Sequence, residues 1–149
     1  NLFKKNCSFV SLNMNEYDNI PEGYNFHWSS CVIEHLGGIS KAIEFLIKSS
    51  KKLKPGGIGI HTTEFNLSSN IDTLDKTDTC ILRKRDIKVL SDKLKSNNLI
   101  LHPIIYDPGI QPYNYQIDTN HIPTSNIHLR ILMDCYVSTS IGLIISKPY

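Results

Sequence analysis

The sequence lacks several features that would place it in a functional class at once. Its 149 residues contain no apolar run near the ~18 to 20 residues that a membrane-spanning helix needs. Arginine is scarce, with 3 among the 16 basic residues, and the net charge is only +2. The basic residues are scattered and do not form the basic stripe of a nucleic-acid-binding protein. We therefore expect neither a membrane nor a nucleic acid as a partner.

Cysteine is also sparse. The four cysteines are Cys7, Cys31, Cys80 and Cys135. None of them has the CxxC spacing of a zinc site, and their density is too low for a disulfide scaffold, so we expect no metal and reduced thiols in a cytoplasmic protein. No basic start leads into an apolar stretch, so no signal peptide is expected. The chain begins with Asn1 rather than Met, which suggests a processed start or a piece of a longer protein.

The hydrophobic pattern that is present alternates between strand and helix periods. Predicted strands are Asn6–Leu12, Tyr24–Ser30, Ile58–Thr63, Ile100–Tyr106 and Tyr136–Lys147. One predicted helix starts at Ile39 and stops at Pro55-Gly56-Gly57, and a second is capped by Asp86 and ends near Asn97-Asn98. Helical crossovers predict parallel strands, and the last pair, without a helix between them, predicts a final antiparallel edge strand. The fold class is therefore α/β with a mostly parallel sheet.

Two connections are longer than the ~12 to 15 residues usual in compact domains. They span residues 65–82 and 107–134, and the second contains three prolines. Loops of this length commonly act as lids or substrate loops. We expect the 107–134 connection to fold over a site at the edge of the sheet.

Polar side chains follow two neighbouring strands of the predicted sheet. The strand 24–30 ends in Ser29, Ser30 and Cys31, followed by Glu34 and His35. The strand 58–63 ends in a second polar group that contains His61 and Glu64, and the first strand is followed by a third, Asn13, Met14 and Asn15. Ligands of open parallel sheets bind beyond the carboxyl ends of the strands. We therefore expect these groups to meet at one edge.

At this point a family resemblance becomes visible. The run from Tyr24 to Leu36, with its Glu34-His35 pair, precedes a helix and the turn Leu53-Lys54-Pro55-Gly56-Gly57. This order resembles the second half of class I S-adenosylmethionine-dependent methyltransferases, over residues 6–147. The run from His61 to Asn66 resembles a bacterial branch often associated with sugar or glycan metabolism. The resemblance implies a partial Rossmann-like methyltransferase sheet.

The sequence departs from that family in informative ways. Asn25 stands where the family usually has Asp, and Asn13 where an acidic residue commonly lies near the adenine. The glycine-rich loop and the acidic residue that holds the ribose occur nowhere in the sequence. Typical element lengths give a complete domain about 170 residues. The resemblance therefore implies that residues 1–149 are a single incomplete domain, its C-terminal half, whose partner is the missing N-terminal half.

The resemblance also implies S-adenosylmethionine as the cofactor. Its expected contacts are Asn13, Met14, Asn15, Ser29, Ser30, Cys31 and Glu34. Methyl transfer to a hydroxyl needs in-line alignment of the acceptor and removal of a proton. The candidate bases, in order of preference, are His61, Glu64 and His35, acting on a hydroxyl or carboxyl acceptor of a small molecule or glycan.

Two other functions remain open at this stage. The first is a non-catalytic, truncated methyltransferase-like module that binds a partner through an exposed half-sheet. The second is a metal-dependent hydrolase that uses His61, Glu64 and His35. Strand alternation places His61 and Glu64 on opposite faces unless the chain has already turned. Cys31 could be a nucleophile beside His35, but a cysteine at a strand end is usually packing, and methyl transfer needs no covalent enzyme intermediate.

Overall fold

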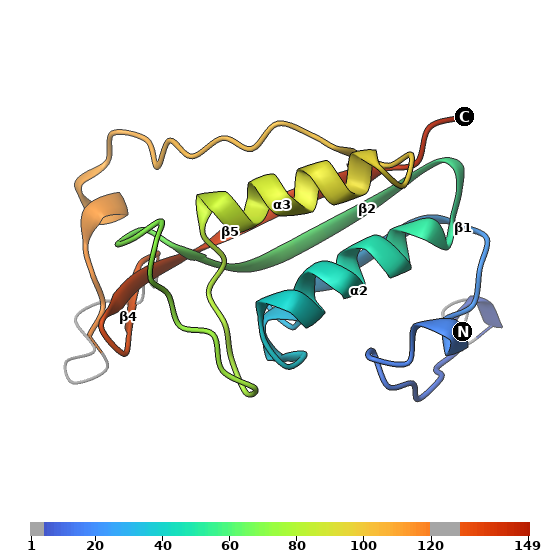
Figure 1. Ribbon diagram of the computed structural model, residues 1–149, viewed down its shortest axis with the longest axis horizontal. Helices are drawn as coiled ribbons and strands as arrows, with labels where there is room; N and C mark the ends of the chain where they lie inside the picture. The colour runs from blue at the N-terminus through green and yellow to red at the C-terminus, as the bar shows by residue number, and fades with distance from the viewer. Residues whose placement is uncertain (1–4, 120–128) are drawn as a thin grey trace.

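The structure is a computed structural model that describes residues 5–119 and 129–149. Two α-helices are described, α2 (Ile39–Lys51) and α3 (Lys84–Lys95), and Figure 1 shows them lying along one sheet. The strands are β1 (Tyr24–Ser30), β2 (Leu53–Asn66), β3 (Ile100–Leu101), β4 (Ile131–Met133) and β5 (Tyr136–Ser146). The short 3₁₀ helices are η1 (Tyr17–Asn19), η2 (Ile33–His35) and η3 (Pro112–Tyr115).

The strand order is β1-β2-β5-β3, and β4 pairs with β5. β1 and β2 are parallel, whereas β5 is antiparallel to both β2 and β3. The prediction of α/β is confirmed, but the sheet is mixed rather than mostly parallel, and β5 lies inside the sheet rather than at its edge. After β2 the chain passes through α3 and forms β3, which is not a neighbour of β2. The place next to β2 is taken by the last strand, β5, which runs antiparallel to it.

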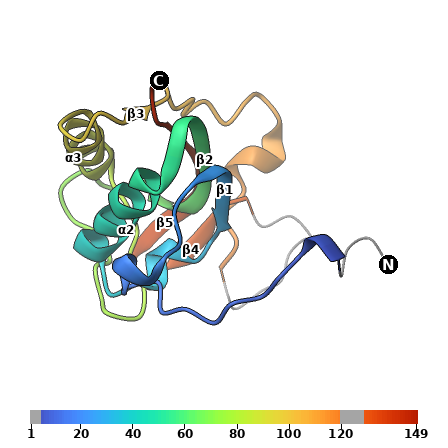
Figure 2. The same cartoon turned by 90° about the vertical axis from the view of Figure 1, so that its right-hand side faces the viewer.

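One face of the sheet is covered. Figures 1 and 2 show α2 and α3 on the same side of the strands. Residues at alternate positions of β2 and β5, such as His61, Leu143 and Ile145, are buried beneath them, and Leu46 and Leu90 on the helices are fully buried. We call this side the covered face, and it holds the hydrophobic core.

The other face is exposed. Ladder pairing places Phe26 beside Ile58, and Trp28 in one row with Ile60 and Ile144. The side chains of these residues are 39% to 69% exposed, and Trp28 is the most exposed of them. We call this surface the open face. In Figure 2 the segment before η1 runs away from the sheet toward the N-terminus.

The start of α2 depends on a glycine. Gly38 has a φ of +97°, and the backbone N–H of Ile39 donates to Asp75 Oδ1 at 2.9 Å. A Cβ on Gly38 would lie 2.7 Å from that carboxylate oxygen. The Asp75 carboxylate thus satisfies a backbone donor in the first turn and interacts favourably with the positive end of the helix dipole.

Two predicted strands differ from the structure. Asn6–Leu12 forms no strand and pairs with none of the described strands, and Phe9 in it is 91% exposed. The strand predicted for Ile100–Tyr106 ends at Leu101, two residues before Pro103, which cannot donate to a ladder.

The turn Pro55-Gly56-Gly57 lies within the first part of β2, which begins at Leu53. Of the predicted 107–134 connection, residues 120–128 lie outside the described residues. No helix in the described ranges is long and apolar enough to cross a membrane.

Candidate functional site

Polar side chains gather at the edge where β1 and β2 end, as the strand pattern predicts. Cys31 donates its backbone N–H to Thr62, which joins the two strand ends. Cys31, Glu34 and Glu64 each bring one sulfur or oxygen atom within 4.8 Å of the others. His35 lines an open cavity together with these three residues. We call Cys31, Glu34, His35 and Glu64 the edge cluster.

Glu64 is held by two serines of β5. The Ser138 hydroxyl donates to Oε2 at 2.5 Å, and the Ser140 hydroxyl donates to Oε1 at 3.1 Å. Glu64 pairs with Ser140 in the antiparallel ladder, so the three side chains project from one side of the sheet. Sequence reasoning missed both serines. Their only local signal is the i, i+2 spacing at the start of the last strand.

Glu34 is the buried member of the edge cluster. It lies in η2, is only 2% exposed, and accepts a hydrogen bond from Thr63 Oγ1 at 3.3 Å. Burial raises the pKa of Glu34, and the nearby negative charge of Glu64 acts in the same direction. The resulting pair contains an oriented carboxylate, Glu64, and a buried one, Glu34, with an increased tendency to hold a proton.

His35 lies at the exposed side of the edge cluster. Its Nδ1 is 2.7 Å from the carbonyl oxygen of Asp78. A carbonyl only accepts, so Nδ1 carries the hydrogen, and Nε2 then keeps the lone pair. His35 can therefore accept a proton at the edge of the sheet through Nε2.

His61, the first-choice base of the sequence analysis, does not lie at this edge. Its ring is 1% exposed and packs on the covered face between Phe45 and His27, with centroid distances of 6.2 Å and 5.0 Å. Burial lowers the pKa of His61 to about 3, and the charge of His27 adds to the effect. Strand alternation explains this position, because it turns His61 inward and Glu64 outward.

Ser29 shares this inward orientation. Its hydroxyl lies 2.7 Å from His61 Nδ1, so it faces the core rather than the edge of the sheet. The metal-dependent hydrolase hypothesis required His61 beside Glu64 and His35. Since the structure buries His61 under α2 and leaves the other two at the edge, this ligand set is not assembled.

Of the predicted cofactor contacts, most meet at one edge. The loop Asn13–Asn15 is fixed beside η2 by Asn15, whose Nδ2 donates to the Leu36 carbonyl at 3.1 Å. Asn13, Asn15, Ser30 and Cys31 are exposed there, and Met14 is half-buried against the core. These neutral amide, hydroxyl and thiol groups suit the hydrogen-bonding edge of an adenine. None of them carries a positive charge for the carboxylate of the methionine part, so the fit is to one half of S-adenosylmethionine.

Comparisons with known proteins identify the fold. No model of a protein family matches the sequence, and no curated protein matches it either. The structure is similar to a solved S-adenosylmethionine-dependent methyltransferase from Clostridium acetobutylicum, with a TM-score of 0.53 and 11% identity. It is also similar to TehB from Haemophilus influenzae, with a TM-score of 0.56 and 12% identity.

The two alignments cover 94% and 99% of this chain but only 64% and 44% of the other chains. The chain therefore spans less than two thirds of the length of one of these proteins and less than half of the other. At this identity the likeness concerns the fold alone. The described residues adopt a Rossmann-like α/β fold similar to that of class I S-adenosylmethionine-dependent methyltransferases.

Proposed function

We propose that this chain is the acceptor-side part of an S-adenosylmethionine-dependent methyltransferase. The observation that carries the proposal is the edge cluster itself. It lies beyond the carboxyl ends of two parallel strands, the position at which open α/β sheets bind ligands, in a fold similar to that of a solved S-adenosylmethionine-dependent methyltransferase. The acceptor is a hydroxyl or carboxyl group on a small molecule or glycan.

Glu64 is our choice for the base that removes the acceptor proton. When bound, the cofactor supplies an electrophilic methyl group on a sulfonium. Ser138 and Ser140 fix the Glu64 carboxylate, and a fixed base in hydrogen-bonding reach is what proton removal needs. Glu34 and Cys31 lie beside Glu64 at the same edge. His35, which lines the same cavity, is the alternative base. Asn13, Asn15 and Ser30 would lie against the adenine side of the cofactor.

The proposed partner is the N-terminal half of the same domain. Two features support it: the apolar open face, and the outer edge of β1, with which no strand of the described residues pairs. Residues 1–149 alone should bind S-adenosylmethionine weakly or not at all by titration calorimetry. A protein extended upstream by some 60 or more residues should bind it, because the missing elements need at least that length. Tight binding by the isolated chain would refute the claim that a second half is needed.

Substitution of Glu64 tests the proposed chemistry. In the full natural protein, Glu64→Gln should lower kcat by about 10² or more, since positioned proton transfer contributes 10² to 10⁴. Glu44→Gln on α2, whose carboxylate forms an exposed pair with Lys41, is the matched control and should leave kcat unchanged. Full turnover in Glu64→Gln together with loss in His35→Gln would move the base to His35. Full turnover in both would show that the acceptor needs no base.

The open face also favours a second candidate function. A non-catalytic module would use the exposed row of Trp28, Ile60 and Ile144 to bind a partner protein. Calorimetry on the full natural protein separates the two functions, because only the methyltransferase should bind S-adenosylmethionine.

A further inference from the structure

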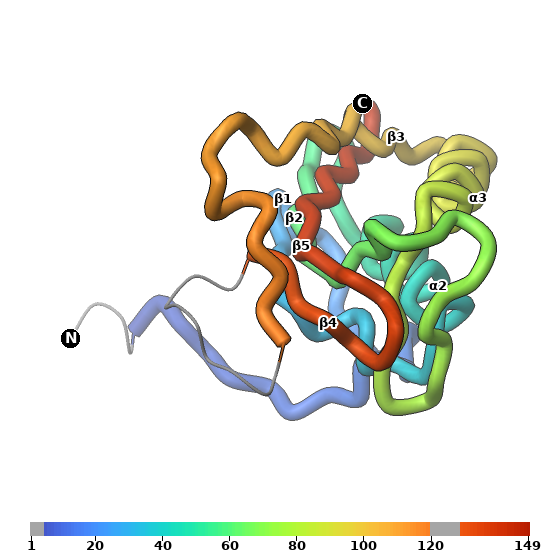
Figure 3. The backbone as a smooth tube through the Cα atoms, turned by 90° about the vertical axis from the view of Figure 1, so that its left-hand side faces the viewer, coloured from blue at the N-terminus to red at the C-terminus, as the bar shows by residue number. Residues whose placement is uncertain are grey.

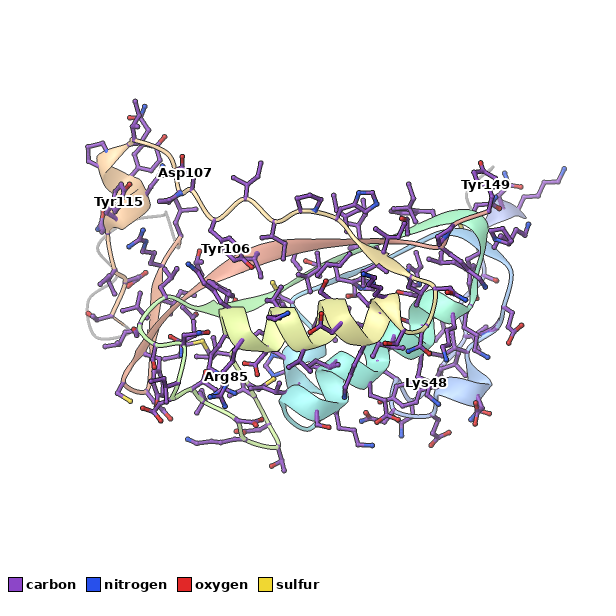
Figure 4. The ribbon with its side chains drawn as sticks, turned by 45° about the horizontal axis from the view of Figure 1, so that its top comes forward. Lys48, Arg85, Tyr106, Asp107, Tyr115 and Tyr149 are labelled. Atoms are coloured by element: carbon purple, nitrogen blue, oxygen red, sulfur yellow. The ribbon has the colours of Figure 1, made fainter. Side chains whose placement is uncertain are left out.

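A second cavity lies beside the edge cluster. It has a volume of about 180 Å³, is open to solvent on one side, and is lined by residues of β2 and β5 and of the segment that leads into η3. Figure 4 shows Tyr106, Asp107 and Tyr115 on this segment, and the Tyr106 ring lies 5.2 Å, centroid to centroid, from the ring of Phe65. In Figure 3 the same segment passes over the end of the sheet that carries β4. We call this space the ring cavity.

Ser140 joins the ring cavity to the edge cluster. It lines the cavity, and its hydroxyl donates to Glu64 Oε1 at 3.1 Å. Cys31 Sγ lies 3.8 Å from the same hydroxyl oxygen. Glu64 itself does not line the cavity, so a hydroxyl group bound beside Ser140 would reach the Glu64 carboxylate through the Ser140 hydroxyl.

The volume of the ring cavity limits what can bind in it. An engineered protein cavity of about 150 Å³ holds one benzene molecule. The ring cavity, at about 180 Å³, has room for one six-membered ring with one or two small substituents and is too small for two linked rings. This size excludes an oligosaccharide as the group that enters the cavity.

The walls of the ring cavity favour a flat, mostly apolar ring. Phe65, Leu67, Tyr106 and Ile141 provide apolar surface. Most polar side chains of the wall already have partners within the protein. Asp107 accepts from the Gly109 N–H, Asn114 donates to the Pro108 carbonyl, Thr139 donates to the Leu129 carbonyl and Ser140 donates to Glu64. A monosaccharide would bury several hydroxyls that need partners, and each one left unpaired costs ~1 to 3 kcal/mol.

We propose that the ring cavity binds the methyl acceptor and that this acceptor is a monocyclic phenol. The inference rests on the proposed function and narrows its substrate class. The phenol ring lies against Phe65 and Tyr106, with its hydroxyl toward Ser140. The phenol O–H bond breaks and its proton passes to the Ser140 hydroxyl oxygen, while the proton of Ser140 passes to the Glu64 carboxylate. The phenol oxygen would form a bond to the methyl carbon as the carbon–sulfur bond of the sulfonium donor breaks, leaving a neutral thioether.

Ligand-detected NMR titration of the full natural protein tests the cavity without requiring catalysis. The two probes are phenol and methyl α-D-glucopyranoside. Phenol should bind, and the glucoside should not. Tyr106→Ala should weaken phenol binding at least tenfold. Tyr113→Ala is the matched control, because Tyr113 is exposed to a similar degree, 46% against 41%, on the same segment but does not line the cavity. It should change phenol affinity less than twofold.

A second variant guards against misfolding of Tyr106→Ala. Leu67 is 40% exposed at the cavity wall, so Leu67→Trp should fill the space without disturbing the core and should abolish phenol binding. Preference for the glucoside, or phenol binding that survives Leu67→Trp, would overturn the inference.

Calorimetry with S-adenosylmethionine distinguishes the two proposals. Absence of phenol binding in a protein that binds S-adenosylmethionine would overturn this inference and leave the proposed function standing. Absence of S-adenosylmethionine binding would overturn the proposed function and the acceptor role together, whatever the phenol titration shows.

Discussion

The two faces of the sheet carry similar apolar side chains but have different surroundings. On the covered face, Leu143 and Ile145 are fully buried against the helices. On the open face, the intervening Ile144 is 42% exposed, and Trp28 in the same row is 69% exposed. The exposure differs because α2 and α3 cover only one face. The side chains themselves would suit a buried position on either face.

This difference indicates what the sequence is adapted to. A strand with one wet face alternates apolar and polar residues, whereas a strand buried on both faces reads as a near-continuous apolar run. Residues 143–145 of β5 form a continuous apolar run, as in a strand that is buried on both faces. The pairs Phe26–Ile58 and Trp28–Ile60 continue the apolar surface of the open face onto β1 and β2. The open face therefore has the composition of a surface that another part of a folded domain covers, which supports the proposed N-terminal partner.

Two adjacent residues of β5 give the strongest test of the difference between the covered face and the open face. In residues 1–149, Leu143→Ala should lower the free energy of unfolding by ~2 to 5 kcal/mol, the usual cost of truncating a buried leucine. At protein concentrations low enough to keep the chain monomeric, Ile144→Ala should cost less than about 1 kcal/mol, because much of that side chain then contacts water. Urea unfolding measures both. Equal losses in the two variants would show that the open face is covered in solution.

Substitution of Gly59 should lower the free energy of unfolding almost as much, because the side chains of His27 and His61 lie against it on the covered face. A Cβ on Gly59 would collide with Nε2 of His27, whose ring stacks edge-on against His61. We expect Gly59→Ala to cost ~1 to 3 kcal/mol in urea unfolding, as overpacking does. Gly142→Ala is the control, since a Cβ there meets no atom within 4 Å.

The double variant His27→Ala with Gly59→Ala checks the cause of the Gly59 effect. It should lose less than the sum of the two single changes, because the collision is gone. Strict additivity would assign the cost to the glycine backbone instead.

Local pattern was enough to predict several elements. Tyr24–Ser30 is the strand that alternation predicted, and the apolar stripe from Ile39 gives α2. The meeting of Glu34 and Glu64 at one edge followed from the parallel-strand rule. These predictions succeeded because each depends on residues close in sequence or on one well-defined crossover.

The failures concern partners distant in the chain. Nothing in the local sequence places β5 between β2 and β3, and nothing in it shows that Asn6–Leu12 stays unpaired. The unexpected inward position of His61 has the same origin, because packing across the whole sheet decides which of the two alternating faces α2 covers. Ser138 and Ser140 act on Glu64 from more than 70 positions away, so their role could only be found in the structure.

The buried histidines predict a smaller effect, seen in the pH dependence of stability. The folded protein holds the pKa of His61 at about 3, against 6.5 for an unperturbed imidazole. As the pH falls below 6.5, the unfolded chain binds a proton that the folded chain does not, so stability falls. The contribution approaches ~1.4 kcal/mol per pH unit for one such group.

Urea unfolding between pH 7 and pH 5 should show this slope. His61→Phe should reduce it and leave the part due to His27, whose pKa burial also lowers. His102→Gln, at an exposed position, should leave the slope unchanged. A slope that survives the loss of His61 intact would place the pKa of this imidazole near its ordinary value and return His61 to the list of candidate bases.

The smallest effect on stability, and the most direct test of the open face, is expected from Trp28→Lys. An exposed side chain contributes little to the folded state, so the free energy of unfolding should change by no more than about 0.5 kcal/mol. Its effect on association should be large, because an apolar face next to an unpaired strand edge promotes self-association. Residues 1–149 should therefore elute from a sizing column as oligomers, and Trp28→Lys should shift them toward monomer. Val89→Lys, at an exposed apolar position of α3, controls for the added charge. A stable monomer before any substitution would mean that the open face needs no cover, and the chain would then be a complete small fold rather than half of a domain.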